Sequence, residues 1–214
     1  MLQRQDAVDV PASDEEEDQV AGCSLETNCR ELRQALREIT ELPPEQIPNH
    51  PALVAALGST CPHGIVVVTD PEVGHLPRQR FTCFMHSFRL ISAPTAAYLM
   101  DELEVQPKSD FVAHLVAHHL SEISAEDAVD GDLVLYSRSQ EVMHAGTVRA
   151  ARVVSKWGVG WLWEHEVFEV PAQYGDKVHF YRRVERGEAE RLFVSYVRNQ
   201  EGTDLVDMVL ARQK

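Results

Sequence analysis

The spacing of hydrophobic residues changes near residue 125, and this change constrains the fold more than any other feature of the sequence. Before it, apolar residues recur at helical spacing, as in SLETNCRELRQALREITEL (24–42) and KSDFVAHLVAHHLSEIS (108–124). After it come short strand-like runs between turn residues: GDLVLYS, EVMHAGTVR, RVVSKWG and VHFYRRV. Helices followed by neighbouring strands predict an α+β fold, in which N-terminal helices pack on a mostly antiparallel sheet.

Composition shifts divide the chain into four segments. The first twenty residues hold seven acidic residues and one arginine, which predicts a solvated, disordered acidic leader over 1–22. Residues 23–77 form a helical lead-in with a short strand, GIVVVTDP, and residues 78–184 form the main α+β domain. Helical spacing returns in 185–214, which predicts a C-terminal helical extension.

The overall composition excludes several classes of protein. Hydrophobic residues make up 44% of the 214 residues and charged residues 25%, as in soluble globular proteins, and no long uncharged apolar run predicts a membrane span. A net charge of −14 argues against a nucleic-acid partner. Without a signal or transit pattern, we expect a cytoplasmic protein, unless it is exported by a route that needs no signal peptide. The oligomeric state is not readable from these features.

Cys83 is the first candidate catalytic residue. It lies in RQRFTCFMHSFRLI (78–91), near the start of a helix expected from Phe81 to about Leu90. A helix N-terminus and a nearby imidazolium both favour the thiolate form of cysteine, which is the nucleophile in thiol catalysis. The alternative is a small, inert core residue, since free cysteine is among the most buried residue types.

His144 is the expected partner of Cys83. In EVMHAGTVR, strand alternation places His144 on one face together with Val142, Gly146 and Val148. A turn at 150–151 would pair 148 with 153, 146 with 155 and 144 with 157. His144 would then be the general base, or else a hydrogen-bonded structural histidine.

A third polar group is needed to orient the imidazole in such a site. The sequence offers Ser155, Lys156 and His165 for this role. In the alternative interpretation, Ser155 and Lys156 shape the end of a strand with the lysine solvated. His165 would then be a structural histidine packed among the aromatic residues of WLWEHEV.

The order of these motifs resembles a known superfamily. FTCFMHSFRL, GDLVLY, HAGTV, SKWGVGWLWEH and YGDKVHFYRR together resemble the papain-like amidases and peptidases of the NlpC and CHAP type. More narrowly, they resemble an uncharacterised, mainly bacterial family related to that fold. The resemblance covers residues 78–183, about half of the chain. Thr82 stands where the superfamily usually has Asp or Asn before the cysteine.

This resemblance implies a papain-like α+β domain that acts as a thiol hydrolase or acyltransferase on an amide or ester. Cys83 would be the nucleophile and His144 the general base, while backbone N–H groups near Cys83 would form the oxyanion hole. No cofactor is implied. The expected substrate is a peptide, a protein or another amide-bearing molecule.

Metal binding is an alternative from a different class. His114, His118 and Glu122 follow one another at i, i+4 spacing, as zinc ligands on one helix face would. Leu115 replaces the glutamate of an HExxH motif, so a metalloprotease would lack its general base. His119 falls within the apolar stripe and is expected in the core. A second ligand set would combine Cys61, His63, His75 and Cys83.

A catalytically inactive papain-like interaction module is the third hypothesis, because a fold does not determine its chemistry. The aromatic run WGVGWLWEH would then supply a recognition surface anchored by Trp161 and Trp163. Burial of Trp157 and Trp163 would instead place this run in the core.

Overall fold

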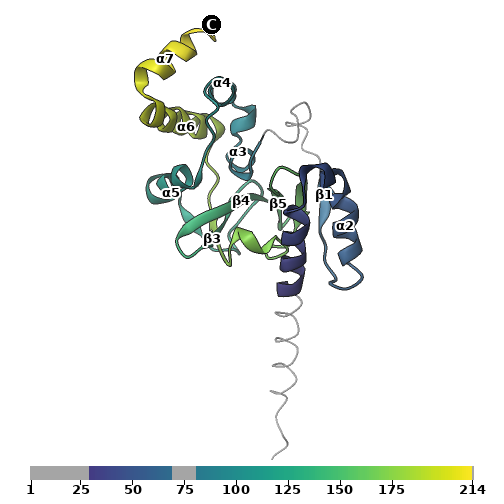
Figure 1. Ribbon diagram of the computed structural model, residues 1–214. Coiled ribbons are helices and arrows are strands. Elements are labelled where there is room, and N and C mark those ends of the chain that lie inside the picture. Colours follow the sequence, from purple (N-terminus) through teal and green to yellow (C-terminus); the bar gives the residue numbers. More distant parts are fainter. Residues whose placement is uncertain (1–28, 69–80, 214) are drawn as a thin grey trace, which may run out of the picture.

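The computed structural model describes residues 29–68 and 81–213 of the chain (Figure 1). Within these residues the fold is α+β, as the sequence predicts, and its centre is a seven-stranded antiparallel sheet in the order β1-β6-β5-β4-β3-β7-β2. The strands are β1 (Val66–Val68), β2 (Glu122–Ile123), β3 (Leu133–Arg138), β4 (Glu141–Arg149), β5 (Arg152–Lys156), β6 (Leu162–His165) and β7 (Lys177–Tyr181).

The N-terminal part of the described chain packs on one face of this sheet. It comprises a helix that includes residues 29–40, the 3-10 helix η1 (Pro44–Asn49) and α2 (His50–Leu57), which is followed by Gly58. The expected strand of the lead-in is β1, which pairs with β6 at the sheet edge. The predicted acidic leader, 1–22, lies outside the described residues. The buried cluster on this face includes Leu32, Leu36, Val54, Val148, Val153, Trp157 and Trp163.

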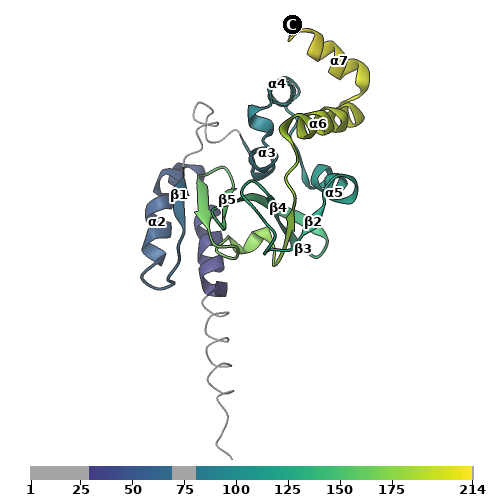
Figure 2. The ribbon, with the colours of Figure 1, turned by 180° about the vertical axis from the view of Figure 1, so that it is seen from behind.

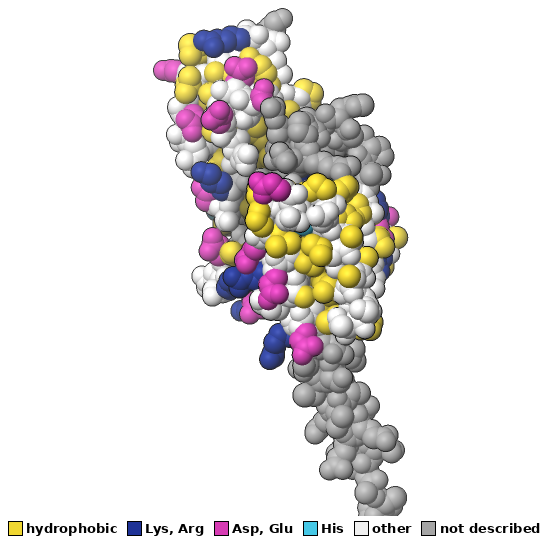
Figure 3. Space-filling view, turned by 45° about the vertical axis from the view of Figure 1, so that its right-hand side comes forward, with side chains coloured by type: hydrophobic (Ala, Val, Ile, Leu, Met, Phe, Trp, Pro, Cys, Tyr) yellow, Lys and Arg dark blue, Asp and Glu magenta, His cyan; other side chains and the backbone are white. Residues whose placement is uncertain are grey.

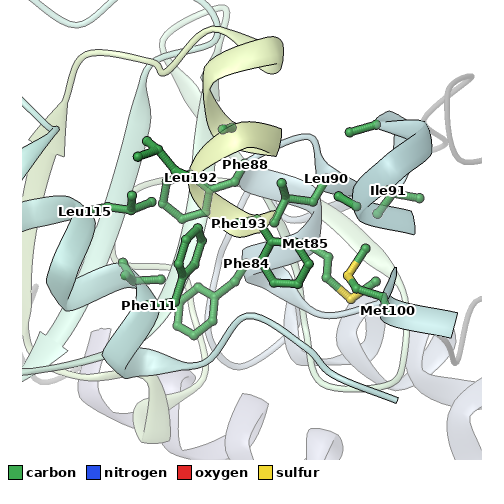
Figure 4. Close-up of a cluster of buried hydrophobic side chains, with 14 of the residues drawn as sticks. Phe84, Met85, Phe88, Leu90, Ile91, Met100, Phe111, Leu115, Leu192 and Phe193 are labelled. Atoms are coloured by element: carbon green, nitrogen blue, oxygen red, sulfur yellow. The ribbon is translucent and has the colours of Figure 1, made fainter. Parts of the chain in front are cut away.

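A second group of helices lies together, away from α2 and β1 (Figure 2), and its buried side chains contribute to the other hydrophobic cluster. These helices are α3 (Cys83–Ser87), η4 (Leu90–Ser92), α4 (Pro94–Glu102), α5 (Ser109–His118), α6 (Arg186–Glu201) and α7 (Thr203–Ala211). The ring of Phe111 meets the rings of Phe88 and Phe193 edge to face, with centroids 6.0 and 5.7 Å apart (Figure 4). These contacts join α5 and α6 to the segment that follows α3.

Two expected helices are shorter than their sequence patterns predict. The helix predicted from Phe81 to about Leu90 spans Cys83–Ser87, because the chain turns at Phe88 and Arg89 takes a left-handed conformation with φ 56°. α5 ends at His118, so Glu122 lies on β2 rather than on the helix.

The β4–β5 hairpin largely follows its predicted register. Ala150 and Ala151 form the turn, both with positive φ, as a type I′ turn requires. Val148 pairs with Val153, and Gly146 with Ser155. The third predicted pair is wrong, because β5 ends at 156 and the backbone N–H of residue 157 donates instead to the carbonyl of residue 161.

A β-bulge lies beside His144. Tyr136 on β3 pairs with His144, but the next pair is Ser137 with Val142, so Met143 is an extra residue in β4. Val142 consequently packs in the cluster formed by α3 to α7, whereas Val148 packs in the cluster of the N-terminal helices. The prediction that Val142 shares a face with Val148 is therefore wrong. The bulge turns the strand at the position of the candidate histidine.

The surface has one notably apolar flank. Hydrophobic side chains gather on the side of the molecule that includes α2 and β1 (Figure 3), among them the exposed residues Leu53 and Val66. Across the described parts of the chain, every helix is too short or too polar to cross a membrane.

Candidate active site

Cys83 and His144 line the same pocket, which has a volume of about 300 Å³. Cys83 is the first residue of α3, and α3 packs against β4 and β5. His144 reaches the pocket from β4, next to the bulge. Lys156, at the end of β5, and Tyr174, on the 3-10 helix η5 (Ala172–Tyr174), complete the ionisable groups of the wall. The remaining lining residues are Phe81, Thr82, Gln106, Met143, Gly158 and Val159.

The start of α3 fixes Cys83 in the pocket. Thr82 is the N-cap residue, and its hydroxyl accepts a hydrogen bond from the backbone N–H of Met85 over 3.3 Å. Cys83 is partly exposed, yet the surrounding protein raises the pKa of its thiol to about 11. Burial is the main cause; backbone N–H groups, including that of Ala145, and the charge of Lys156 oppose it.

The imidazole of His144 is buried and lies flat against the ring of Tyr174. Only 1% of His144 is exposed. The two ring centroids are 3.8 Å apart, and their planes differ by 5°. Nε2 of His144 is buried and has no hydrogen-bond partner among the described residues. Burial, followed by the charges of His165 and His86, holds the pKa of His144 well below its usual value.

These two shifts determine the resting protonation of the pair. A raised pKa keeps the proton on Cys83, and a lowered pKa keeps His144 neutral at physiological pH. The pocket therefore contains a thiol and a neutral imidazole instead of a preformed thiolate–imidazolium pair. A neutral imidazole can accept the thiol proton during attack on a substrate.

Ser155 and His165, two of the residues predicted to orient His144, form a separate network. Their Oγ and Nε2 atoms are 2.8 Å apart, and Nδ1 of His165 lies 2.7 Å from the carbonyl of Glu166. Nδ1 therefore carries the proton, and the Ser155 hydroxyl donates to Nε2. Trp157 Nε1 donates to the same hydroxyl over 3.0 Å. Neither Ser155 nor His165 lines the pocket.

His165 is a structural histidine packed among aromatic residues, as one of the two interpretations of the sequence predicts. It is fully buried, and its ring centroid lies 5.5 Å from that of Trp157. Burial lowers its pKa to about 4. The ring is therefore neutral at physiological pH.

Lys156, the third predicted orienting residue, is 1% exposed, so the expectation of a solvated lysine is wrong. Its Nζ lies 4.6 Å from the centroid of the Phe81 ring and donates to the carbonyl of Gly160. The Phe81 ring gives the cation a favourable contact away from water. In this position the charge of Lys156 lowers the pKa of Cys83.

Tyr174 is a pocket residue that the sequence pattern does not predict. It belongs to YGDKVHFYRR, one of the runs that carry the resemblance, but no residue-type pattern marks it as a site residue. Its hydroxyl accepts a hydrogen bond from the backbone N–H of Gly158 over 2.8 Å. This contact ties η5 to the turn between β5 and β6, on the pocket wall.

Asp132, in the GDLVLY run, has a structural role. Its carboxylate accepts hydrogen bonds from the backbone N–H groups of Val129 and Arg183 and from the side chain of Arg182, at 2.8–3.0 Å. The side chain therefore joins the start of β3 to the end of β7. This motif supports the sheet without reaching the pocket.

The expected metal ligands do not assemble in the described part of the chain. The rings of His114 and His118 lie 4.8 Å apart on α5, but Glu122 pairs with His179 at 2.8 Å. His119 is exposed, which contradicts its expected core position. Within residues 29–68 and 81–213, no three His, Cys, Asp or Glu side chains are grouped to hold a metal ion. His75, from the second expected set, lies outside the described residues.

Two of the three tryptophans of the run WGVGWLWEH belong to the core. Trp157 and Trp163 are 1% and 2% exposed, and their rings stack with centroids 4.9 Å apart. Trp161 donates from Nε1 to the carbonyl of Ile47 over 2.8 Å. Trp157 and Trp163 are therefore core residues, whereas Trp161 is half-buried, so a surface anchored by both Trp161 and Trp163 does not form.

Comparison with known proteins adds no assignment, because no family model, curated protein or solved structure matches this chain.

Proposed function

We propose that the protein is a thiol hydrolase or acyltransferase in which Cys83 attacks an amide or ester carbonyl and His144 acts as general base. The observation that carries this proposal is the convergence of both residues on one pocket, from α3 and β4. A cysteine-led helix packed against an antiparallel sheet also supports a papain-like domain. The motifs that resemble the NlpC and CHAP type agree with this assignment.

The first half of the reaction forms a thioester. As the sulfur of Cys83 attacks the carbonyl carbon, its proton passes to the neutral imidazole of His144. Collapse of the tetrahedral intermediate breaks the carbon–nitrogen or carbon–oxygen bond. His144 then returns the proton to the leaving amine or alcohol, and the acyl group remains on Cys83.

The second half regenerates the thiol. His144 removes a proton from water, which attacks the thioester carbon, and Cys83 leaves and recovers its proton. An amine or alcohol acceptor in place of water turns hydrolysis into acyl transfer. Neither half requires a redox step or a cofactor, because every proton and bond is supplied by the substrate, the acceptor and the Cys–His pair.

Backbone N–H groups are available for the oxyanion. The N–H groups of the first turn of a helix have no partner within that helix, and those of Cys83 and Phe84 lie close enough to the sulfur to lower the pKa of Cys83, as does that of Ala145 on β4. Preorganised donors of this kind stabilise the charge that develops on the carbonyl oxygen.

The pocket suits a peptide, a protein or another amide-bearing substrate. The apolar part of the pocket wall is formed by Phe81, Met143 and Val159. Side-chain hydrogen bonds to a substrate are available from Gln106 and Thr82. Mixed linings of this kind bind the apolar part of a ligand and fix its orientation through a few polar contacts.

The test is acylation by p-nitrophenyl acetate, an activated ester. We expect a burst of nitrophenolate and the mass of one acetyl group on the peptide that contains Cys83, with both absent in Cys83→Ala. His144→Gln should slow acylation on the order of 100-fold, the usual contribution of a general base. Cys61→Ala is the matched control, because Cys61 is a buried thiol in the other cluster.

Two results would overturn the proposal. One is acetylation of Cys83 no faster than that of Cys23, Cys29 and Cys61, and the other is an unchanged rate in His144→Gln. Either result would make the catalytically inactive papain-like module the better description.

A further inference from the structure

His144 has no hydrogen-bonded orienting group at Nε2 within the described chain. Ser155 and His165 are occupied with each other, and Nζ of Lys156 donates to the carbonyl of Gly160. A general base must nevertheless be held at a fixed angle to its nucleophile, because a small misplacement costs a large part of the rate. Another contact must therefore hold the imidazole.

The stacked ring of Tyr174 provides that contact. At 3.8 Å between centroids and 5° between planes, the two rings touch over their faces. Tyr136 is the other aromatic neighbour, but its ring is 5.6 Å away and tilted by 47°. Face-to-face contact restricts the tilt of the imidazole, whereas the more distant, tilted ring does so less.

Tyr174 is itself held firmly. Its hydroxyl accepts the N–H of Gly158 at 2.8 Å. The next residue, Gly175, has φ 111°, and a Cβ there would collide with the backbone of Ser137. Arg33, on the N-terminal helix, donates to the carbonyl of Gly175, and Arg138 donates to the carbonyl of Ala172 over 3.0 Å.

We propose that Tyr174 is the positioning residue of His144, and that ring stacking replaces the hydrogen-bonded third group of a cysteine–histidine site. This inference rests on the proposed function, in which His144 is the general base. It also gives the N-terminal helix a role in catalysis, because Arg33 holds the loop that carries Tyr174.

The same contact favours the protonated form of His144 during the reaction. When the imidazole accepts the proton of Cys83 it becomes a cation that faces the π-system of Tyr174. A cation against an aromatic face is stabilised, and the effect is larger where water is excluded. Loss of the ring should therefore slow acylation about tenfold.

Two variants separate the ring from the hydroxyl. Tyr174→Phe keeps the stacked ring and loses the hydrogen bond to Gly158, and it should acylate with p-nitrophenyl acetate within about threefold of wild type. Tyr174→Leu removes the ring and should lose about tenfold. Thermal unfolding of both variants establishes that the compared proteins are folded.

A second measurement is independent of activity. The imidazole protons of His144, assigned with His144→Gln, should resonate upfield in wild type because they lie over an aromatic face. The shift should persist in Tyr174→Phe and disappear in Tyr174→Leu. If Tyr174→Leu does not fold, the wild-type and Tyr174→Phe spectra still show whether the stack exists.

The two proposals fail in different ways. Absence of acetylation in wild type overturns the proposed function, and with it the catalytic role of Tyr174, even where the upfield shift shows that the ring is positioned. Acylation in Tyr174→Leu at the wild-type rate overturns the positioning role alone. So does an equal loss in Tyr174→Phe and Tyr174→Leu, or a wild-type spectrum without the upfield shift.

Discussion

The hydroxyl of Ser155 donates to Nε2 of His165 across 2.8 Å, inside a core in which both residues are fully buried. With Nδ1 bonded to the carbonyl of Glu166 and Trp157 donating to the same hydroxyl, the polar atoms of this group satisfy one another. A buried network of this kind contributes to stability only while the histidine is neutral.

Stability should therefore fall in acid through His165. Burial lowers its pKa from 6.5 to about 4, so between these values the unfolded chain binds a proton that the native protein does not. The free energy of unfolding should decrease by about 1.4 kcal/mol per pH unit over this window, about 3 kcal/mol in total. His144, whose pKa is also lowered, adds to the slope. Urea unfolding at pH 7, 6, 5 and 4 measures this decrease in the free energy of unfolding.

The matched variants for this prediction are His165→Gln and Ser155→Ala. His165→Gln should reduce the pH dependence of the free energy of unfolding by the contribution of about one proton. Ser155→Ala keeps the titrating ring and should lower stability by roughly 1–3 kcal/mol at every pH, because it leaves Trp157 without its acceptor. An unreduced slope in His165→Gln would show that the native ring is not held neutral.

The hairpin shows which parts of the fold were predictable from sequence. Alternation along β4 and β5, with alanines at the turn, predicts the pairs of Val148 with Val153 and Gly146 with Ser155, both of which form. The pattern breaks at Met143, because the bulge is set by the register of β4 against β3 and not by the alternation along β4 itself. The alternation of apolar and polar residues along one strand does not indicate where that strand bulges when it pairs with its neighbour.

The residues of the pocket were likewise predictable only in part. Cys83 and His144 were identified from residue types on a helix start and a strand, and both line the pocket. Tyr174 was missed because its position depends on Gly175 and on arginines from other elements. The burial of Lys156 was missed because strand alternation predicts which face a side chain takes but not what covers that face.

Lys156→Met should raise the pKa of Cys83 above its value of about 11. The lysine charge favours the thiolate, so its removal should slow alkylation by iodoacetamide at fixed pH by about fivefold, equivalent to ~1 kcal/mol of lost attraction. Peptide mapping across a pH series measures the rate at Cys83. Cys29 lies on the N-terminal helix and does not line the pocket. Its alkylation rate in the same samples serves as the internal control. A rate at Cys83 equal to that of wild type would exclude an electrostatic role for Lys156.

Gly146→Ala should disrupt the strand that carries His144. An added Cβ would lie 2.6 Å from Cγ1 of Val153 and 3.0 Å from the carbonyl of Val154, so β5 has to move. We expect a loss of at least about 2 kcal/mol in the free energy of unfolding. Gly187→Ala, at the start of α6, meets no atom within 4 Å and should be neutral or stabilising by up to about 1 kcal/mol. Equal stability of the two variants would contradict the close packing of β4 on β5.

Gly175→Ala and Gly202→Ala separate backbone strain from steric collision next to Tyr174. Both glycines have positive φ, 111° and 92°, with ψ 172° and 139°, a combination that residues with a Cβ rarely adopt, so both variants incur a conformational cost of roughly 1–3 kcal/mol. Only at Gly175 would the added Cβ also strike the backbone of Ser137, whereas Gly202 has open space. We expect urea unfolding to show an additional loss of roughly 2 kcal/mol or more in Gly175→Ala. Because that collision displaces η5, Gly175→Ala should also slow acetylation of Cys83, and Gly202→Ala should leave it unchanged. If both variants acetylated at the wild-type rate, the position of Tyr174 would not depend on Gly175.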